Sequence, residues 1–154
     1  MTQKNYYIRQ ISDKEIDLIK PLWIKLKTLH FNLSPHFKQR FQSMTWEMRK
    51  NKLFDKSQDM LIECAIDLKN YIIGYCISTI DKIDTSVGEI DSIFVEEKYR
   101  KQNIGRELMN NALKWFDSKD VLNQKLLVGA GNENVIEYYN QFDFYPLHIV
   151  LQRK

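Results

Sequence analysis

The sequence has little of the chemistry that would hold a metal ion or a disulfide framework. Its only cysteines, Cys64 and Cys76, form no C-x-x-C pair, and neither has a histidine at metal-ligand spacing. The three histidines, His30, His36 and His148, are scattered in the same way. We therefore expect reduced thiols with packing roles, and we predict no metal.

A long apolar run and a strong surplus of one charge are also missing. No window approaches the roughly 18 to 20 apolar residues of a membrane span, and the start MTQKNYYIRQ has no basic region followed by an apolar stretch. The formal charge is +3, from 23 basic and 20 acidic residues. We expect a cytoplasmic protein with no membrane and no nucleic-acid partner, although the basic segment 98–106 keeps nucleic-acid binding as an alternative.

What is present fits a single folded domain over residues 1–154. An apolar fraction of 44% and a charged fraction of 28% are ordinary for a globular protein of this length. Residues 6–11 are β-prone, and Ser12 with Glu15 forms a capping-box pattern that predicts a helix, with Pro21 a possible kink. Ser34-Pro35 predicts a second helix start.

The rest of the chain alternates between strand and helix patterns. A tight turn near Asn70 predicts a hairpin, which would set Cys64 about opposite Cys76. The predicted elements after it are a strand at 88–95, a helix at 104–115, a strand at 125–129, a helix at 134–140 and a strand at 144–152. The order β-α-α-β-β-β-α-β-α-β predicts a mixed α/β sheet.

Residues 93–109, IFVEEKYRKQNIGRELM, leave a strand, cross a basic turn and enter a helix. A helix start exposes backbone N–H groups and carries about half a unit of positive charge, so this geometry suits a pyrophosphate. Arg100, Lys101 and Arg106 add countercharges. The physical interpretation is an anion site, and the alternative is an ordinary solvated basic surface.

Arg100 to Gly105, R-K-Q-N-I-G, resembles the acetyl-CoA motif Q/R-x-x-G-x-G/A of the GNAT N-acetyltransferase superfamily. Asn103 replaces the first glycine, and asparagine is the non-glycine residue that best tolerates a left-handed backbone. Residues 132–144, NENVIEYYNQFDF, resemble a second family motif, N-x-x-A-x-x-F-Y-x-x-x-G-F, with Asp143 in place of the glycine. Two motifs at the proper distance carry the resemblance.

This resemblance implies the GNAT fold, a central mixed but mostly antiparallel sheet of six to seven strands flanked by about four helices. It implies transfer of an acetyl group from acetyl-CoA to a primary amine by direct attack in a ternary complex. A non-catalytic acyl-CoA-binding or regulatory module is the alternative. The residues that the resemblance assigns to the donor are Phe94, Val95, Arg100, Lys101, Gln102, Asn103, Ile104, Gly105, Arg106, Asn132 and Tyr139.

The resemblance also suggests catalytic roles. Tyr139 matches the tyrosine that protonates the departing thiolate, and Glu89 matches a glutamate early on the strand before the motif. Glu89 and Asp91 share a parity on that strand, so both could face one side, with Glu89 the preferred base and Asp91 the reserve. A backbone N–H near Val95 would meet the oxyanion, and the Phe94–Val95 peptide would pair with the pantetheine arm.

The acceptor stays open at this level. A polyamine, an aminoglycoside-like amine, an amino acid and a protein N-terminus are all compatible with the N-terminal helices that would flank its cleft. The apolar tail HIVLQ, residues 148–152, is a plausible contact in a homodimer.

Overall fold

The computed structural model describes residues 3–154 and contains one five-stranded sheet with the strand order β1-β2-β3-β4-β5. Strands β1 to β4 are antiparallel to their neighbours, and β5 runs parallel to β4. The strands are β1 (Tyr6–Ile11), β2 (Ser57–Asp67), β3 (Ile72–Asp81), β4 (Val87–Val95) and β5 (Asn123–Leu126). The α-helices are α1 (Lys20–Leu33), α2 (Lys38–Ser43), α3 (Trp46–Lys56), α4 (Ile104–Ser118) and α5 (Ile136–Asn140).

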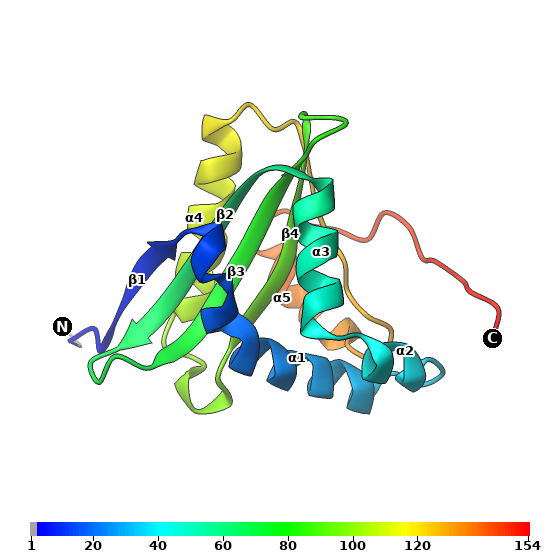
Figure 1. Ribbon diagram of the computed structural model, residues 1–154, viewed down its shortest axis with the longest axis horizontal. Coiled ribbons are helices and arrows are strands. Elements are labelled where there is room, and N and C mark those ends of the chain that lie inside the picture. The colour runs from blue at the N-terminus through cyan, green and yellow to red at the C-terminus, as the bar shows by residue number, and fades with distance from the viewer. Residues whose placement is uncertain (1–2) are drawn as a thin grey trace.

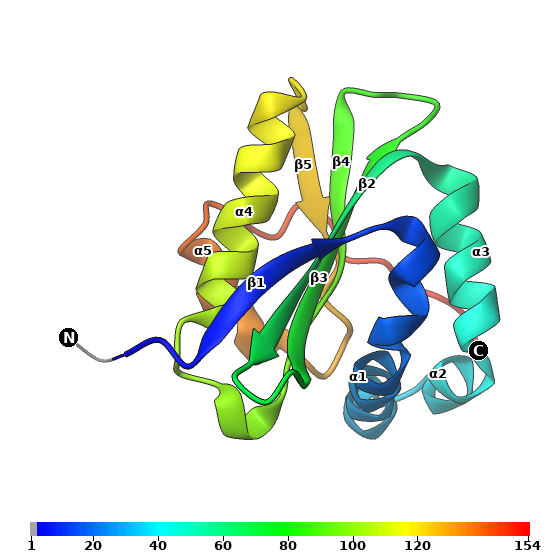
Figure 2. The same cartoon turned by 60° about the vertical axis from the view of Figure 1, so that its left-hand side comes forward.

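Helices cover both faces of the sheet. Helices α1 and α3 lie on one face, and α4 lies on the other with α5 beside it (Figures 1 and 2). Because side chains alternate along a strand, each face builds its own core. Tyr75 and Ile77 pack toward α1 and α3, whereas Cys76 and Ile90 pack toward Leu108 and the rest of α4.

The N-terminal helical region follows the predicted pattern only in part. The capping box is confirmed, since the backbone N–H of Ser12 donates to Glu15 Oε2 at 2.9 Å. The first turns form a 3-10 helix, and Pro21 lies in the first turn of α1, where a missing N–H costs nothing, so it causes no kink. Ser34 does not start a helix directly: its hydroxyl accepts the N–H of Phe37, and α2 begins after this turn.

The β2–β3 hairpin forms as predicted, but its register differs by one residue. A bulge between Ala65 and Ile66 shifts the pairing, so that Cys64 lies opposite Tyr75 rather than Cys76. Because a one-residue shift sends side chains to opposite faces, the two thiols belong to different cores and do not face each other. Both cysteines are free and buried.

A second bulge interrupts β4 at Asp91. Ile77 of β3 pairs with Ser92, and the next residue, Ser78, pairs with Ile90, so Asp91 is an extra residue without a partner on β3. The side chains of Asp91 and Ser92 therefore both turn toward the face of α1 and α3, where Ser92 bonds the Tyr75 hydroxyl at 2.7 Å.

The predicted count of six to seven strands is wrong, because the segment after α5 pairs with no strand in the described chain. This tail, residues 145–154, leaves the α5 side and ends near α2 (Figure 1). Without a partner edge its apolar side chains stay in solvent, and Leu147, Ile149, Val150 and Leu151 are 84% to 91% exposed. The homodimer contact expected for residues 148–152 stays a prediction.

Within residues 3–154 we find no helix that is both long and apolar enough to cross a membrane.

Candidate acyl-transfer site

The last half of β4 has a free edge on the side of β5. The parallel pairing covers Val87 to Ile90 on β4 and ends at Leu126 of β5, while β4 continues to Val95. The two strands therefore part at the Asp91 bulge. An unpaired strand edge exposes backbone N–H and C=O groups, so an extended ligand arm can pair with it as an added strand.

The alternation of β4 decides which groups the free edge offers. The N–H of Glu96 bonds the carbonyl of Ile73 at 2.8 Å, so this residue points toward β3. The neighbouring residue of a strand points the other way, and the N–H and C=O of Val95 face the free edge. Arg100 reaches the same place, because its Nε donates to the Val95 carbonyl at 3.0 Å.

The segment between β4 and α4 adopts the conformation that an anion site needs. Lys101 and Asn103 both have φ near 65°, so the predicted left-handed Asn103 is confirmed and Lys101 is a second left-handed residue that the sequence did not reveal. In such a turn, successive backbone N–H groups point toward one place. Gln102 lies between the two left-handed residues. No side chain caps α4, so the N–H groups of Ile104 and its neighbours in the first turn have no intrahelical partner.

The basic side chains of this segment lie in different places. Arg100 folds back onto β4, with its guanidinium carbon 5.6 Å from the centroid of the Phe94 ring. Arg106 points toward α5 and donates to Gln141 Oε1 at 2.7 Å. Arg100 thus contacts β4 and Arg106 contacts the end of α5, and Lys101 lies exposed at the turn before α4.

Gly105 has a specific steric reason to lack a side chain. A Cβ built on it would lie 2.8 Å from the hydroxyl oxygen of Tyr138 and 3.9 Å from Val95 Cγ2. The resemblance assigned this glycine to the donor, and the structure places a tyrosine beside it. Tyr138 thus brings its hydroxyl to the first turn of α4.

Replacing Gly105 by alanine is expected to displace Tyr138 and to weaken donor binding roughly 5- to 150-fold, the range of a 1–3 kcal/mol overpacking cost. The dissociation constant for CoA, measured by calorimetry, checks this result. Gly129→Ala is the matched control, because a Cβ at that position meets nothing within 4 Å. Equal affinities in the two variants would contradict the steric explanation.

Tyr139 lies next to Tyr138 on α5, with the two ring centroids 5.5 Å apart. Burial raises the pKa of Tyr139 to about 12, so the phenol keeps its proton throughout the physiological range. Its hydroxyl makes no hydrogen bond to another residue of the described chain. Asn132, also assigned to the donor, precedes α5 and donates its backbone N–H to Gly129 at 3.0 Å.

The structure brings Glu89 and Asp91 together on the face of α1 and α3. Lys56, the last residue of α3, pairs with both: its Nζ lies 2.5 Å from Glu89 Oε2 and also contacts Asp91 Oδ1. Arg49, two turns earlier, donates to the Asp91 carbonyl at 2.7 Å and lies 3.9 Å from Oδ1. Thr79 of β3 donates to the other carboxylate oxygen, Oδ2.

The two carboxylates differ in what remains free. Both oxygens of Asp91 are engaged, and its side chain is only 2% exposed. Glu89 is 16% exposed, and its Oε1 has no partner among residues 3–154. Burial, followed by the charge of Glu89, raises the pKa of Asp91. For Lys56, burial lowers the pKa, but the bonds to the two carboxylates outweigh burial and raise it.

Sequence reasoning did not find Lys56, Arg49 or Thr79. They lie on other elements, and nothing in their local pattern distinguishes them from surface residues. The doubled polar pair Asp91-Ser92 is the one signal that could have indicated the bulge, since it breaks the alternation of apolar and polar residues along β4.

Substituting methionine for Lys56 is expected to destabilise the protein by about 1–3 kcal/mol, because the buried charge of Asp91 then keeps only Arg49, 3.9 Å from its Oδ1, as a cationic partner. A raised carboxyl pKa in the folded state penalises only the ionised form. The loss of unfolding free energy therefore appears as the pH rises above 3.9, the approximate pKa of an Asp carboxyl in the unfolded chain, and it is smallest below this pH. Urea unfolding at pH 4.5 and pH 8 measures the difference.

Lys50→Met on the same helix is the matched control, because Lys50 pairs with the largely exposed carboxylates of Asp17 and Glu47. Lys50→Met should change the free energy of unfolding little at either pH. A loss in Lys56→Met that does not depend on pH would contradict the role given to Asp91.

The described chain holds no group of three or more His, Cys, Asp or Glu side chains that could bind a metal ion.

Comparison with known proteins identifies the family. The sequence matches the Acetyltransferase (GNAT) family over residues 26–144, most of its length. The chain belongs to the GNAT family. Members of this family use acetyl-CoA, and the residues that the match spans run from α1 to the end of the α5 region, including the free edge of β4 and the uncapped start of α4.

Individual GNAT proteins support the same assignment. An uncharacterized N-acetyltransferase of Methanocaldococcus jannaschii is 25% identical over 151 residues, which cover 96% of this chain and 64% of that protein. The chain thus spans slightly less than two thirds of this relative's length.

Solved structures share the fold. A mutant of a Bacillus halodurans protein superposes with a TM-score of 0.76 at 15% identity, covering 96% of this chain and 99% of that one. The aminoglycoside N-acetyltransferase AAC(6')-Iy in complex with CoA gives a TM-score of 0.66 at 15% identity, covering 96% and 98%. At these identities the likeness concerns the fold.

Proposed function

We propose that this GNAT protein is an enzyme that transfers the acetyl group of acetyl-CoA to a primary amine by direct attack in a ternary complex. One observation carries the proposal: β4 continues past the end of β5 and is followed, after the turn of residues 96–103, by an uncapped α4. A free strand edge for the pantetheine arm is thus continuous with an anion site for the pyrophosphate. Glu89 lies on the same strand, toward α3.

The donor residues follow from this geometry. The backbone N–H groups of Gln102 to Arg106 would bind the pyrophosphate, with Arg100 and Lys101 supplying countercharge. The Phe94–Val95 peptide would bind the pantetheine arm along the free edge, with Asn132 and Tyr139 on its other side. Acetyl-CoA would supply the acetyl group as a reactive thioester.

Glu89 is the better candidate for the general base, because its Oε1 is free whereas both oxygens of Asp91 are used. An amine with a pKa near 10.4 is almost wholly protonated at pH 7, so a proton must leave before attack. Because Val95 lies six residues farther along β4, Glu89 would take this proton through a chain of waters. Asp91 would hold Lys56 and keep Glu89 in position.

Two further groups would stabilise the reacting centre. The N–H of Val95 on the free edge would donate to the carbonyl oxygen as negative charge develops there. Tyr139, which keeps its proton, would protonate the departing thiolate. Neither Cys64 nor Cys76 is suited to carry the acetyl group, because burial raises the pKa of each thiol to about 12.

The test is mass-spectrometric detection of acetylated products after incubation with acetyl-CoA and a panel of amines and peptides. Mass detection avoids the thiol background of the two cysteines. An acetylated product supports the transferase. CoA binding without any product would instead favour the non-catalytic binding module.

A further inference from the structure

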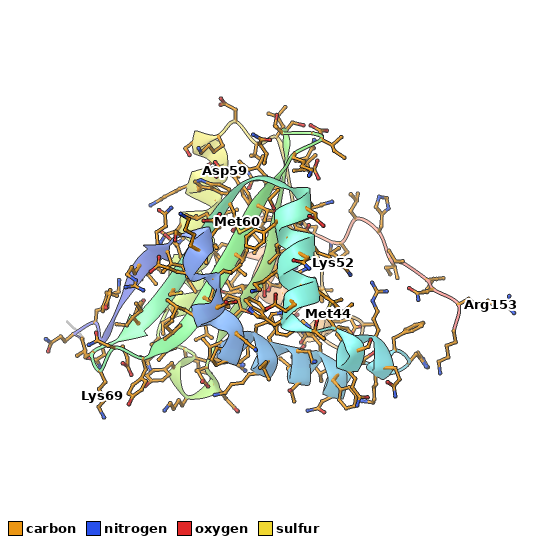
Figure 3. The ribbon with its side chains drawn as sticks, viewed as in Figure 1. Met44, Lys52, Asp59, Met60, Lys69 and Arg153 are labelled. Carbon is orange, nitrogen blue, oxygen red and sulfur yellow. The ribbon has the colours of Figure 1, made fainter. Side chains whose placement is uncertain are left out.

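A hydrogen bond joins the turn of residues 96–103, here called the donor turn, to the β2–β3 hairpin. Tyr99 ends a short 3-10 helix within this turn, and its hydroxyl donates to Asp67 Oδ2 at 2.9 Å. Asp67 is the last residue of β2, 32 residues earlier in the chain. Figure 3 labels Lys69 at the tip of this hairpin, at the end of the sheet opposite Asp59.

The hairpin holds the Asp67 carboxylate in one place. Its Oδ1 accepts the backbone N–H groups of Lys69 and Tyr71, each at 2.9 Å, and the residue is only 7% exposed. Bonds from the Tyr71 N–H and the Tyr99 hydroxyl lower the pKa of Asp67, so the carboxylate is charged at neutral pH. The bond from Tyr99 is therefore charge-assisted and has a fixed acceptor.

The other contacts of the donor turn lie near its ends or are local. Glu96, at its start, pairs with Lys25 of α1. Ile104, directly after its end, is buried in the core under α4. The side chain of Arg100 returns to the last residue of β4, immediately before the turn. The Tyr99 hydroxyl thus ties the middle of the turn to a distant element.

The backbone of the donor turn is unfavourable by itself. Lys101 and Asn103 both have φ near 65°, a conformation that costs an L-residue free energy. Residues keep such a backbone only where the surrounding structure fixes them. A donor turn that is free at its middle would also adopt other conformations, in which its N–H groups point elsewhere. A ligand would then have to order the turn as it binds, and its affinity would fall.

Resting on the proposed function, we infer that Tyr99 and Asp67 are positioning residues for the pyrophosphate of acetyl-CoA. Their bond holds the donor turn in the conformation that binds the pyrophosphate, and they act through the backbone of residues 101–104 rather than by touching the donor. The effect is confined to this end of the donor, because the pantetheine arm would lie along β4, whose pairing with β3 extends to Val95.

The experiment compares two acetyl donors, with the amine identified in the panel as acceptor. Acetyl-CoA carries the pyrophosphate, whereas S-acetylpantetheine has the same thioester and arm without it. We expect Tyr99→Phe to raise the KM for acetyl-CoA and the Kd for CoA about tenfold, the scale of one hydrogen bond to a charged group. Its kcat with acetyl-CoA and its kcat/KM with S-acetylpantetheine should stay within about twofold of the parent. General structural damage would instead lower turnover of both donors.

Tyr71→Phe is the matched control. It removes the same hydroxyl from the same hairpin, where the Tyr71 side chain is 67% exposed and the backbone N–H, which the variant keeps, makes the bond to Asp67. It should change neither CoA affinity nor the turnover of either donor. Equal losses of kcat/KM with the two donors in Tyr99→Phe, or a CoA affinity equal to that of Tyr71→Phe, would overturn the inference while leaving the transferase intact.

If the parent protein binds CoA but acetylates no amine, the proposed function fails, and the inference is judged by calorimetry with CoA. A loss of CoA affinity in Tyr99→Phe that is absent from Tyr71→Phe supports the positioning role. Equal affinities overturn it, and a parent protein that does not bind CoA overturns both proposals.

Discussion

Replacing Tyr139 by phenylalanine is expected to lower kcat about 100-fold while changing CoA affinity less than threefold, at the lower end of what general acid–base help contributes. The change removes one hydroxyl and keeps the ring that packs against Tyr138. Burial raises its pKa to about 12, so at neutral pH the hydroxyl still carries the proton that it would give to the thiolate. Single-turnover kinetics of acetyl transfer measure the effect on the chemical step.

Tyr138→Phe is the matched control for this substitution. Both residues lie on α5, but the Tyr138 hydroxyl lies against Gly105 at the start of α4. Removing it should alter donor binding more than kcat. If Tyr138→Phe and Tyr139→Phe lowered kcat equally, the proton donor would not be assigned to Tyr139 alone.

The sheet could be predicted from sequence wherever pattern and local chemistry agree. The hairpin and the strand before the motif are rich in β-branched and aromatic residues, helix α4 has a 3.6-residue apolar period, and all three form. The final strand was predicted on the same grounds and does not form. A β-prone segment becomes a strand only when an edge receives it, and the local pattern of residues 145–152 contains no information about that edge.

The site shows the same division between local and long-range information. The left-handed Asn103 was predictable because the helix start and the residue type both favour it. Lys56 was not, because its role depends on α3 ending beside the Asp91 bulge of β4. The Cys64–Cys76 pairing failed for a related reason: one bulge in β2 shifts the register, and a bulge has no strong signature in a single sequence.

Replacing Glu89 by glutamine is expected to lower kcat/KM about 100-fold near pH 7, because the acceptor ammonium then loses its proton only to solvent. The substitution is isosteric, and the amide can still meet Lys56 through its oxygen. Glu47→Gln on α3 is the control, since the Glu47 side chain is 71% exposed and pairs only with Lys50. It should leave kcat/KM within about twofold of the parent.

The pH dependence separates a base from a residue that only binds. Below about pH 10, each unit by which the pH rises increases the neutral fraction of a lysine-like amine tenfold. The Glu89→Gln variant should follow this fraction and approach the parent enzyme by about pH 9.5, whereas the parent enzyme, which removes the proton itself, should vary less. A deficit that stays at 100-fold from pH 7 to pH 9.5 would assign Glu89 to acceptor binding, and proton removal would then fall to a water held elsewhere on this face.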